Sequence, residues 1–459
     1  MEYARILIVV AITVLVVATT LFLLALAVLR LRQVIHSRRQ GRVEVQQAPL
    51  VARICAGFPP TPEELPDILP TPGSSEAEAL ENVLREALAG AGPEQAARLE
   101  EFMRDAGITG RYLDMLTGGS RWERAMAAAW LADHRGPEIA EALLAATEDP
   151  DREVRTVAVR SLGRLVDDRS LVTLAEVLVA VAGGEENLSQ RVVAGSLTRF
   201  GPQAADALQP MLEHPSWRVR SAAAYVLGEA GASSSVPKLT ERLADAEPDV
   251  RAKAVQALGQ VGARSALFSI IGSLEDDAWV VRMHAVRALG LLADPAAVAP
   301  LGRRLFDSHW RVRQEAAHIL ANMSAEAREV LISTLLTSDD HYARQQVVEE
   351  FQRTRVISDA IDGLEREVEG VVRPGSAAAL LAAVANTGAV AMLAHAAISH
   401  GRSKVRQRVL GILAPLAHPR VTGVLERAAT EDPDPVVRAT AAAHLTAREA
   451  AAASAAEEV

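Results

Sequence analysis

The side chains of this sequence that could do chemistry recur at two fixed positions of a repeated helical phrase. The phrase contains an arginine, and in its central copies the residues two and five positions later are polar or aromatic. These positions hold Tyr225, Lys253, Gln256, His284, Arg287, Glu315, His318, Gln346 and Glu349. They fall between the apolar positions of a helix, so we expect them to face solvent along one surface. The pattern indicates a partner-binding surface, with an ordinary solvated face as the alternative.

Catalytic and metal-binding patterns are missing from the sequence. His284 and His318 fall on adjacent copies of the phrase with Glu315 nearby, but no metal-ligand spacing accompanies them. There is no phosphate-binding loop, nucleophile elbow or dinucleotide fingerprint, and Cys55 is the single cysteine. We therefore expect no enzyme activity, no cofactor and no metal.

The element that carries these positions is a helix repeated with a nearly constant period. The arginines of the phrase are usually 31 residues apart and lie at 124, 155, 191, 220, 251, 282, 313, 344, 406 and 438. Near residue 375, where another is due, the chain reads Arg-Pro-Gly-Ser. A fixed period of this length is typical of stacked-repeat proteins, in which each repeat contacts only its neighbours.

Residues 234–262 illustrate one repeat. Apolar spacing predicts a first helix over 235–243, a tight turn, and a second helix from Val250 to Gly259, with Asp249 placed to cap it. Alanines on the second helix favour close helix packing. The aspartate before each second helix and the arginine within it are placed to form a structural ladder between neighbouring repeats.

The phrases Asp249-Val250-Arg251, Trp310-Arg311-Val312-Arg313 and Ala257-Leu258-Gly259 resemble HEAT repeats. More narrowly, they are similar to the short bacterial variety found in the subunits that attach bilins to phycobiliproteins. The resemblance covers about 119–448 and implies an all-α, right-handed α-solenoid of stacked helix pairs. It implies little about function beyond the binding of partners.

Aromatic residues form a second stripe, two or three positions before five of the repeat arginines. They are Trp122, Trp217, Trp279, Trp310 and Tyr342. Tryptophan is common at interface hot spots, but at this position it can also cover the neighbouring helix end. The large area that an aromatic ring buries favours packing.

Residues Ile6–Leu29 contain no charged residue, proline or glycine. Twenty-four helical residues span about 36 Å, which is sufficient to cross a bilayer. The apolar stretch is longer than that of a cleaved signal peptide, so we expect a single transmembrane anchor. Arginines cluster after it, which predicts an outward N-terminus and a cytoplasmic body at the inner membrane.

Charge separates this anchor region from the rest of the chain. The first 45 residues have a net charge of +4, so the remainder has −14 of the total of −10. An acidic body argues against a nucleic-acid partner. Prolines between 49 and 72 predict an extended linker, in which the apolar stretch Leu50–Phe58 could instead dock on the body.

The sequence thus predicts a bacterial-type membrane-anchored scaffold or adaptor that binds a protein, itself membrane-associated, on the concave face of its solenoid. Two alternatives remain: an accessory subunit of a membrane enzyme such as a glycosyltransferase or transporter, and a lyase or chaperone for a prosthetic group. The predicted segments are a transmembrane helix (1–30), a basic and Pro-rich linker (31–74), capping helices (75–118), the solenoid (119–448) and an Ala/Glu-rich tail (449–459).

Overall fold

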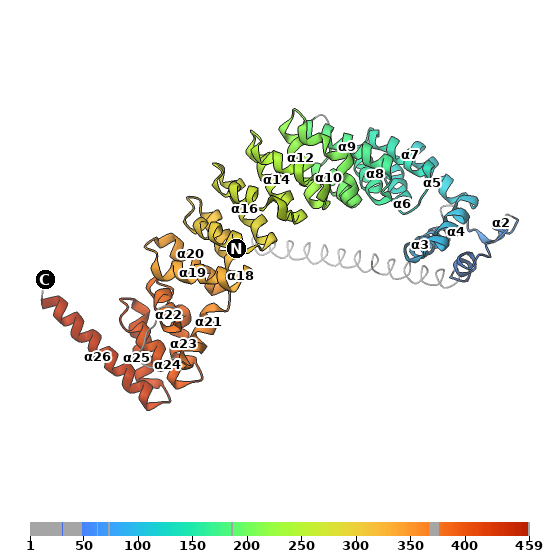
Figure 1. Cartoon of the computed structure of the whole chain (residues 1–459). Helices are drawn as coiled ribbons and strands as arrows, with labels where there is room; N and C mark the ends of the chain where they lie inside the picture. The colour runs from blue at the N-terminus through green and yellow to red at the C-terminus, as the bar shows by residue number, and fades with distance from the viewer. Residues whose placement is uncertain are drawn as a thin grey trace, which may run out of the picture. The chain divides into compact units, whose positions relative to one another are not determined.

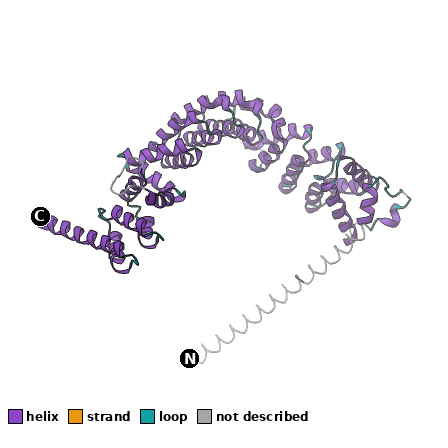
Figure 2. Cartoon of the chain, turned by 60° about the horizontal axis from the view of Figure 1, so that its bottom comes forward, coloured by secondary structure: helices purple, strands orange, loops and turns teal. Residues whose placement is uncertain are grey.

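The computed structural model describes residues 48–457 except 62, 72–73, 185–186 and 367–375, and also Arg30. Every regular element in these ranges is a helix (Figures 1 and 2). The chain divides into two compact units, Met1–Phe200 and Gly201–Val459. The predicted transmembrane helix Ile6–Leu29 lies outside the described residues, and no helix within them has the length and apolarity to cross a membrane. The all-α prediction is confirmed for the described chain, while the anchor stays a prediction.

The Pro-rich segment of unit 1 is more ordered than an extended linker. Residues 48–55 are helical, and a short helix α2 follows at Leu65–Ile68. Leu50, Val51 and Ile54 are buried, and Arg98 donates a 2.9 Å hydrogen bond to the carbonyl of Cys55. The extended-linker prediction is therefore wrong for these residues, because their apolar side chains dock on the body.

Three helices follow in unit 1, as α3 (Ser75–Gly90), α4 (Pro93–Asp105) and α5 (Ile108–Gly118). Ser74 caps α3 by accepting a hydrogen bond from the amide of Ala77, and Pro93 occupies the first position of α4. The remaining helices of this unit are α6 (Arg121–Leu131), α7 (Pro137–Ala145), η1 (Ala146–Glu148), α8 (Arg152–Leu165), α9 (Asp168–Gly183) and α10 (Gln190–Leu197).

Unit 2 repeats one pattern, a first helix followed by a second helix, and several of the first helices are short and continue into a 3-10 turn. The first helices are α11 (Ala204–Leu208) with η3 (Pro210–Glu213), α13 (Val236–Glu241), α15 (Leu267–Gly272), α17 (Val298–Arg303), α19 (Ala325–Thr337), α21 (Val356–Gly363), α23 (Ala391–Ser399) and α25 (Pro419–Glu431). The second helices are α12 (Trp217–Glu229), α14 (Pro248–Val261), α16 (Trp279–Leu292), α18 (Trp310–Met323), α20 (His341–Arg353), α22 (Ala377–Asn386), α24 (Ser403–Leu413) and α26 (Pro435–Glu457). From α12 to α20 each second helix packs against the next, which places equivalent positions side by side (Figure 1).

Small residues set the close approach of these second helices. A Cβ added at Gly259 would lie 2.7 Å from both the Cα and the Cβ of Ala288. Gly259 therefore serves packing inside α14 and does not end the helix as the sequence predicted. The helix continues to Val261 and ends at Gly262, whose φ of 72° is left-handed.

An arginine ladder links successive repeats within each unit. In five repeats the Nε and Nη2 atoms of the arginine donate to both oxygens of one aspartate, at 2.7–2.9 Å. The pairs are Arg124–Asp149 in unit 1, and Arg220–Asp245, Arg251–Asp276, Arg282–Asp307 and Arg406–Asp432 in unit 2. The predicted ladder is confirmed at these five pairs.

The aspartate of the ladder also fixes the turn before the second helix. Asp245 accepts a 3.0 Å hydrogen bond from the amide of Glu247, so Asp245 and not the predicted Asp249 organises the start of α14. Burial raises the pKa of Asp245, but the hydrogen bonds from Arg220 and from the Glu247 amide outweigh burial and lower it overall. The carboxylate is thus held ionised between two repeats.

Candidate partner-binding site

The nine predicted site residues, called the polar row below, lie on α12, α14, α16, α18 and α20 of unit 2. At its first end the Lys253 ammonium lies 5.1 Å from the ring centroid of Tyr225 and donates a 3.0 Å hydrogen bond to Oε1 of Gln256. Burial lowers the pKa of Lys253. All three side chains are half-buried, and each contacts another of the three.

The middle of the polar row joins α16 to α18. Arg287 forms an ion pair with Glu315, with 3.0 Å between Nε and Oε1. His284 lies half-buried beside them, and burial, reinforced by the charges of Lys253 and Arg287, lowers its pKa to about 4. At neutral pH His284 is therefore an uncharged imidazole that can donate or accept a hydrogen bond.

The far end of the polar row joins α18 to α20. Nδ1 of exposed His318 lies 3.0 Å from Oε1 of Glu350, and Gln346 donates a 3.2 Å hydrogen bond to Glu349. Gln346 is 9% exposed, so the expectation that it faces solvent is wrong. The other eight predicted residues are half-buried or exposed at the surface of unit 2.

Glu350 is the functional candidate that sequence reasoning missed. Its side chain is 2% exposed, Arg353 lies 3.6 Å from Oε2, and that oxygen is buried without a hydrogen-bond partner. The sequence did hold a signal. Glu350 follows its repeat arginine by six positions, where Ala257 and Ala288 stand in earlier repeats, so a carboxylate replaces a packing alanine.

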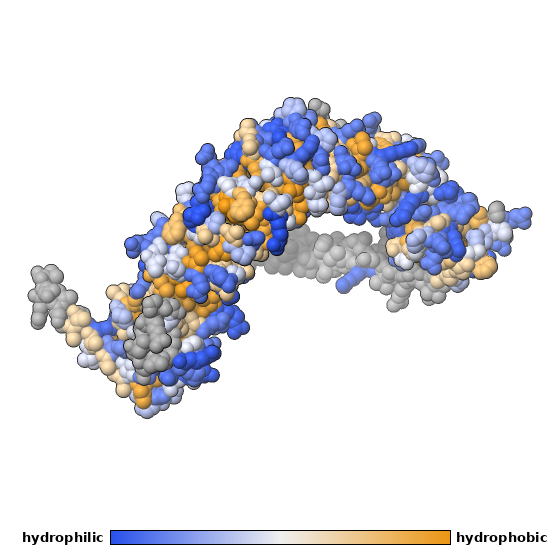
Figure 3. Space-filling view, in the orientation of Figure 1, coloured by the Kyte–Doolittle hydropathy of each residue, from blue (hydrophilic) through white to orange (hydrophobic). Residues whose placement is uncertain are grey.

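The predicted packing role of the aromatic stripe holds only in part. Trp217 and Trp279 are half-buried, and the ring of Trp279 stacks on His309 with centroids 4.0 Å apart. The other three members are 71%, 52% and 67% exposed, namely Trp122, Trp310 and Tyr342. Figure 3 shows hydrophobic surface around α16 among hydrophilic residues. The stripe is therefore a second accessible surface.

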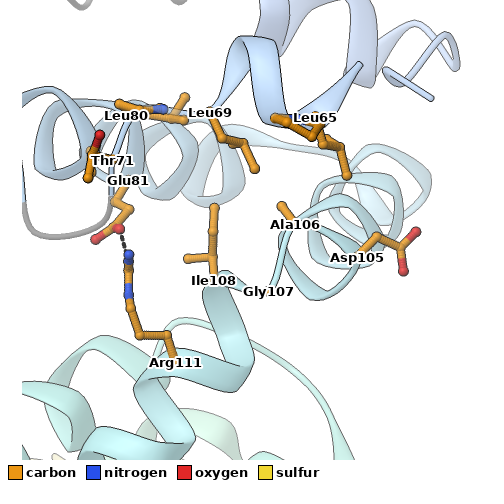
Figure 4. Close-up of a pocket in the computed structure, with 13 residues that line it drawn as sticks. Leu65, Leu69, Thr71, Leu80, Glu81, Asp105, Ala106, Gly107, Ile108 and Arg111 are labelled. Atoms are coloured by element: carbon orange, nitrogen blue, oxygen red, sulfur yellow. Dashed lines mark hydrogen bonds and ion pairs between the residues drawn. The ribbon is translucent and has the colours of Figure 1, made fainter. Parts of the chain in front are cut away.

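An apolar hollow of unit 1 beside α2 has a volume of about 600 Å³ (Figure 4). Leu65 and Leu69 line it from one side and Ile108 from the other. Its polar wall is the ion pair of Arg111 with buried Glu81, which also accepts a 2.5 Å hydrogen bond from the Tyr112 hydroxyl. The Glu81 carboxylate of this wall is therefore already engaged by two side chains.

Metal binding finds no support in the part of the chain that the structure describes. No group of three or more His, Cys, Asp or Glu side chains is arranged there to hold an ion. His318 contacts Glu350 and not His284, so the two histidines do not form a joint site. The chemistry available along the polar row is hydrogen bonding and ion pairing.

Paired helices with equivalent faces in contact define the class of α-helical repeat proteins. Within that class the chain belongs to the HEAT repeats, whose family model matches residues 112–183, 175–259, 236–305, 265–352 and 357–446. These matches confirm the predicted resemblance over most of the body. No curated protein matches the chain.

Among solved structures, the chain is similar to an engineered protein at 20% identity, covering 80% of this chain and 98% of that one with a TM-score of 0.31. It is also similar to importin beta, at 13% identity, 85% and 68% coverage and a TM-score of 0.40. A third is the complex of CpcE and CpcF of phycocyanin lyase from Nostoc sp. PCC7120, at 19% identity, 61% and 94% coverage and a TM-score of 0.25.

Proposed function

We propose that this protein is a non-enzymatic scaffold or adaptor that binds a protein partner along the polar row. The observation that carries the proposal is the row itself: on five neighbouring second helices, polar side chains contact one another across the repeats. Solenoids bind partners on extended surfaces of this kind. Half-buried Lys253 and His284 are already partly desolvated, which reduces the cost of covering them with a partner.

The charges along the row define what a partner should offer. Lys253 lies at its first end and Arg287 in its middle, whereas Glu349 lies at its far end. A partner with acidic groups opposite α14 and α16 and a basic group opposite α20 would be complementary. The proposed surface is the concave face of the solenoid, and the proposed location is the cytoplasmic side of an inner membrane, anchored by Ile6–Leu29.

The test is affinity capture in mild detergent with mass spectrometry. The variant His284→Ala/Arg287→Glu/His318→Ala should lose a partner that the wild type retains, because it alters three side chains of the row on the adjacent helices α16 and α18. The control is Arg303→Glu, a charge reversal at an exposed position of a first helix, which should retain it. Circular dichroism confirms that both variants are folded. A partner that remains bound to the triple variant would refute the polar row as the site.

A further inference from the structure

The rung of Arg313 in the arginine ladder has the arginine but no aspartate. Arg313 follows Arg282 by one period, and its Nη1 donates to the carbonyls of Asp307 at 2.8 Å and Ser308 at 3.3 Å. Arg282 makes the equivalent contacts with Asp276 at 2.8 Å and Asp277 at 3.1 Å. Arg313 is thus held by its turn in the same way as the ladder arginines that bind a carboxylate.

The missing carboxylate is explained by the residue at its position. The aspartates of Arg220, Arg251 and Arg282 each lie 25 residues further along the chain, and 25 residues after Arg313 stands Ser338. Ser338 performs the local task of the aspartate, because its Oγ accepts a 3.1 Å hydrogen bond from the amide two residues on. The serine side chain is shorter than that of aspartate, and its hydroxyl carries no charge. It therefore does not replace the carboxylate as the partner of the guanidinium.

The Nε donor of Arg313 is left without an acceptor. Its Nε is buried and has no hydrogen-bond partner, and its guanidinium carbon lies 5.5 Å from the ring centroid of Tyr342. The Nε of Arg344, in the next rung, is also buried without a partner. Asp339 is exposed, and Asp340 is engaged in capping α20 through the amide of Ala343 at 2.9 Å.

We propose that Arg313, at the rung where Ser338 replaces the aspartate, forms a carboxylate-binding site that accepts an aspartate or glutamate side chain of an acidic peptide segment in a protein partner. In every complete rung the same fork holds a planar carboxylate in two parallel hydrogen bonds. A partner carboxylate would complete the interrupted rung. This site, called the ladder gap, is separate from the polar row and does not depend on it.

The surroundings of the ladder gap suit a peptide. Trp310 and Tyr342 are exposed beside it, and the guanidinium of Arg311 lies 5.3 Å from the ring centroid of Trp310. The contact of Arg313 with Tyr342 is weaker than a bidentate carboxylate pair, so an incoming carboxylate can replace it. The net charge of −10 opposes general attraction of anions, so binding of an acidic peptide requires a local site.

The test supplies the missing carboxylate from the protein itself, by a substitution at Ser338. Ser338 has φ −82° and ψ 138°, close to the −63° and 145° of Asp245, so Ser338→Asp should place its carboxylate on Arg313. The matched control is Ser338→Asn, which has the same shape without the charge. Arg313→Gln removes the guanidinium instead. All are made in the full chain, in mild detergent.

Binding is measured by fluorescence anisotropy with a labelled octaglutamate peptide and its octaglutamine counterpart. We expect octaglutamate to bind the wild type and Ser338→Asn, and to bind Ser338→Asp and Arg313→Gln at least about tenfold more weakly. Thermal unfolding should show Ser338→Asp to be more stable than Ser338→Asn, because it completes the ladder. A Ser338→Asp variant that binds weakly and is nevertheless more stable separates loss of the site from loss of the fold.

Three results would overturn the proposal. Octaglutamate binding equal to octaglutamine binding would show that no carboxylate site exists. Equal stability of Ser338→Asp and Ser338→Asn would show that a carboxylate at 338 does not reach Arg313. Inorganic phosphate that displaces octaglutamate at equal concentration would assign the site to phosphate and not to carboxylate. Loss of the affinity-captured partner on altering the polar row alone leaves this proposal unaffected.

Discussion

Arg282 shows how a single side chain connects three parts of the fold. Its guanidinium binds both oxygens of Asp307 in the next repeat and two carbonyls of the turn before its own helix. The hydrogen bonds to Asp307 raise the pKa of Arg282, and the side chains of the pair are 11% and 2% exposed. In buried pairs of this kind, removing one partner is strongly destabilising because it leaves the other charge buried without compensation.

Arg282→Ala should therefore be strongly destabilising. Removing the guanidinium leaves a buried, ionised Asp307, which typically costs about 3–5 kcal/mol. Urea denaturation followed by circular dichroism measures the effect. The control, Arg303→Ala, alters an exposed arginine and should change the free energy of unfolding by no more than about 0.5 kcal/mol. Similar urea midpoints for the two variants would contradict a structural role of the ladder.

His284 makes stability depend on pH in a predictable direction. Its pKa is lowered from 6.5 to about 4, mainly by burial. Between these two pH values the imidazole is therefore protonated in the unfolded chain and neutral in the folded chain. The stabilisation is fully present above about pH 6.5 and is lost as the pH falls toward 4. We expect His284→Gln to reduce the decline of the unfolding midpoint over this range. An unchanged pH profile in the variant would show that His284 is solvated.

The second helix is the element on which both candidate surfaces are built. One of its sides carries the polar row, its start carries the aromatic stripe and the ladder arginine, and its buried side carries alanine, valine and leucine. Close packing of α14 on α16 keeps the residues of neighbouring helices within reach of one another. Gly259 sets that spacing, because Ala288 occupies the space that a Cβ would need.

Gly259→Ala should weaken this packing. The added methyl would lie 2.7 Å from the Ala288 backbone, so the helices must separate, at a cost of about 1–3 kcal/mol. Gly195→Ala in α10 is the matched control, because nothing lies within 4 Å of its Cβ position and alanine favours a helix. Thermal melts of both should move in opposite directions. A stabilising Gly259→Ala would show that the contact is looser than the structure indicates.

At the scale of the whole molecule, the parts that follow from local pattern were predictable from the sequence. The repeat period predicted stacked helix pairs, and the position of Arg251 in its helix predicted the ladder. The polar row was found because two fixed offsets on a helix define one face. These inferences need only helical geometry within a repeat and identical stacking between repeats.

Features that depend on exceptions to the pattern were not predictable in the same way. The docking of Leu50 and Ile54 depends on a surface formed by later residues, and the prolines nearby indicated an extended chain. The contact of His318 with Glu350 requires the register between two repeats. The ladder gap at Ser338 becomes visible only when the complete rungs show which residue should bind Arg313.

Membrane anchoring is the whole-molecule prediction that decides where these surfaces act. The sequence of Ile6–Leu29 is uncharged, would span about 36 Å if helical, and is followed by arginines 30, 32, 38, 39 and 42. If the stretch spans a bilayer, a partner that is also at the membrane meets the polar row at raised effective concentration. We expect the full chain to stay in the membrane pellet after a carbonate wash, and a variant lacking residues 1–47 to appear in the supernatant.

Replacing Ile6–Leu29 with an unrelated apolar helix then separates two functions of the segment. Retention at the membrane with the partner still captured supports a simple anchor, because any spanning helix would confine the body equally well. Retention with the partner lost indicates that the native helix itself packs on a partner helix, as in an accessory subunit of a membrane enzyme. Full-length protein in the wash supernatant would contradict the anchor, and binding through the polar row would then have to occur without confinement to a surface.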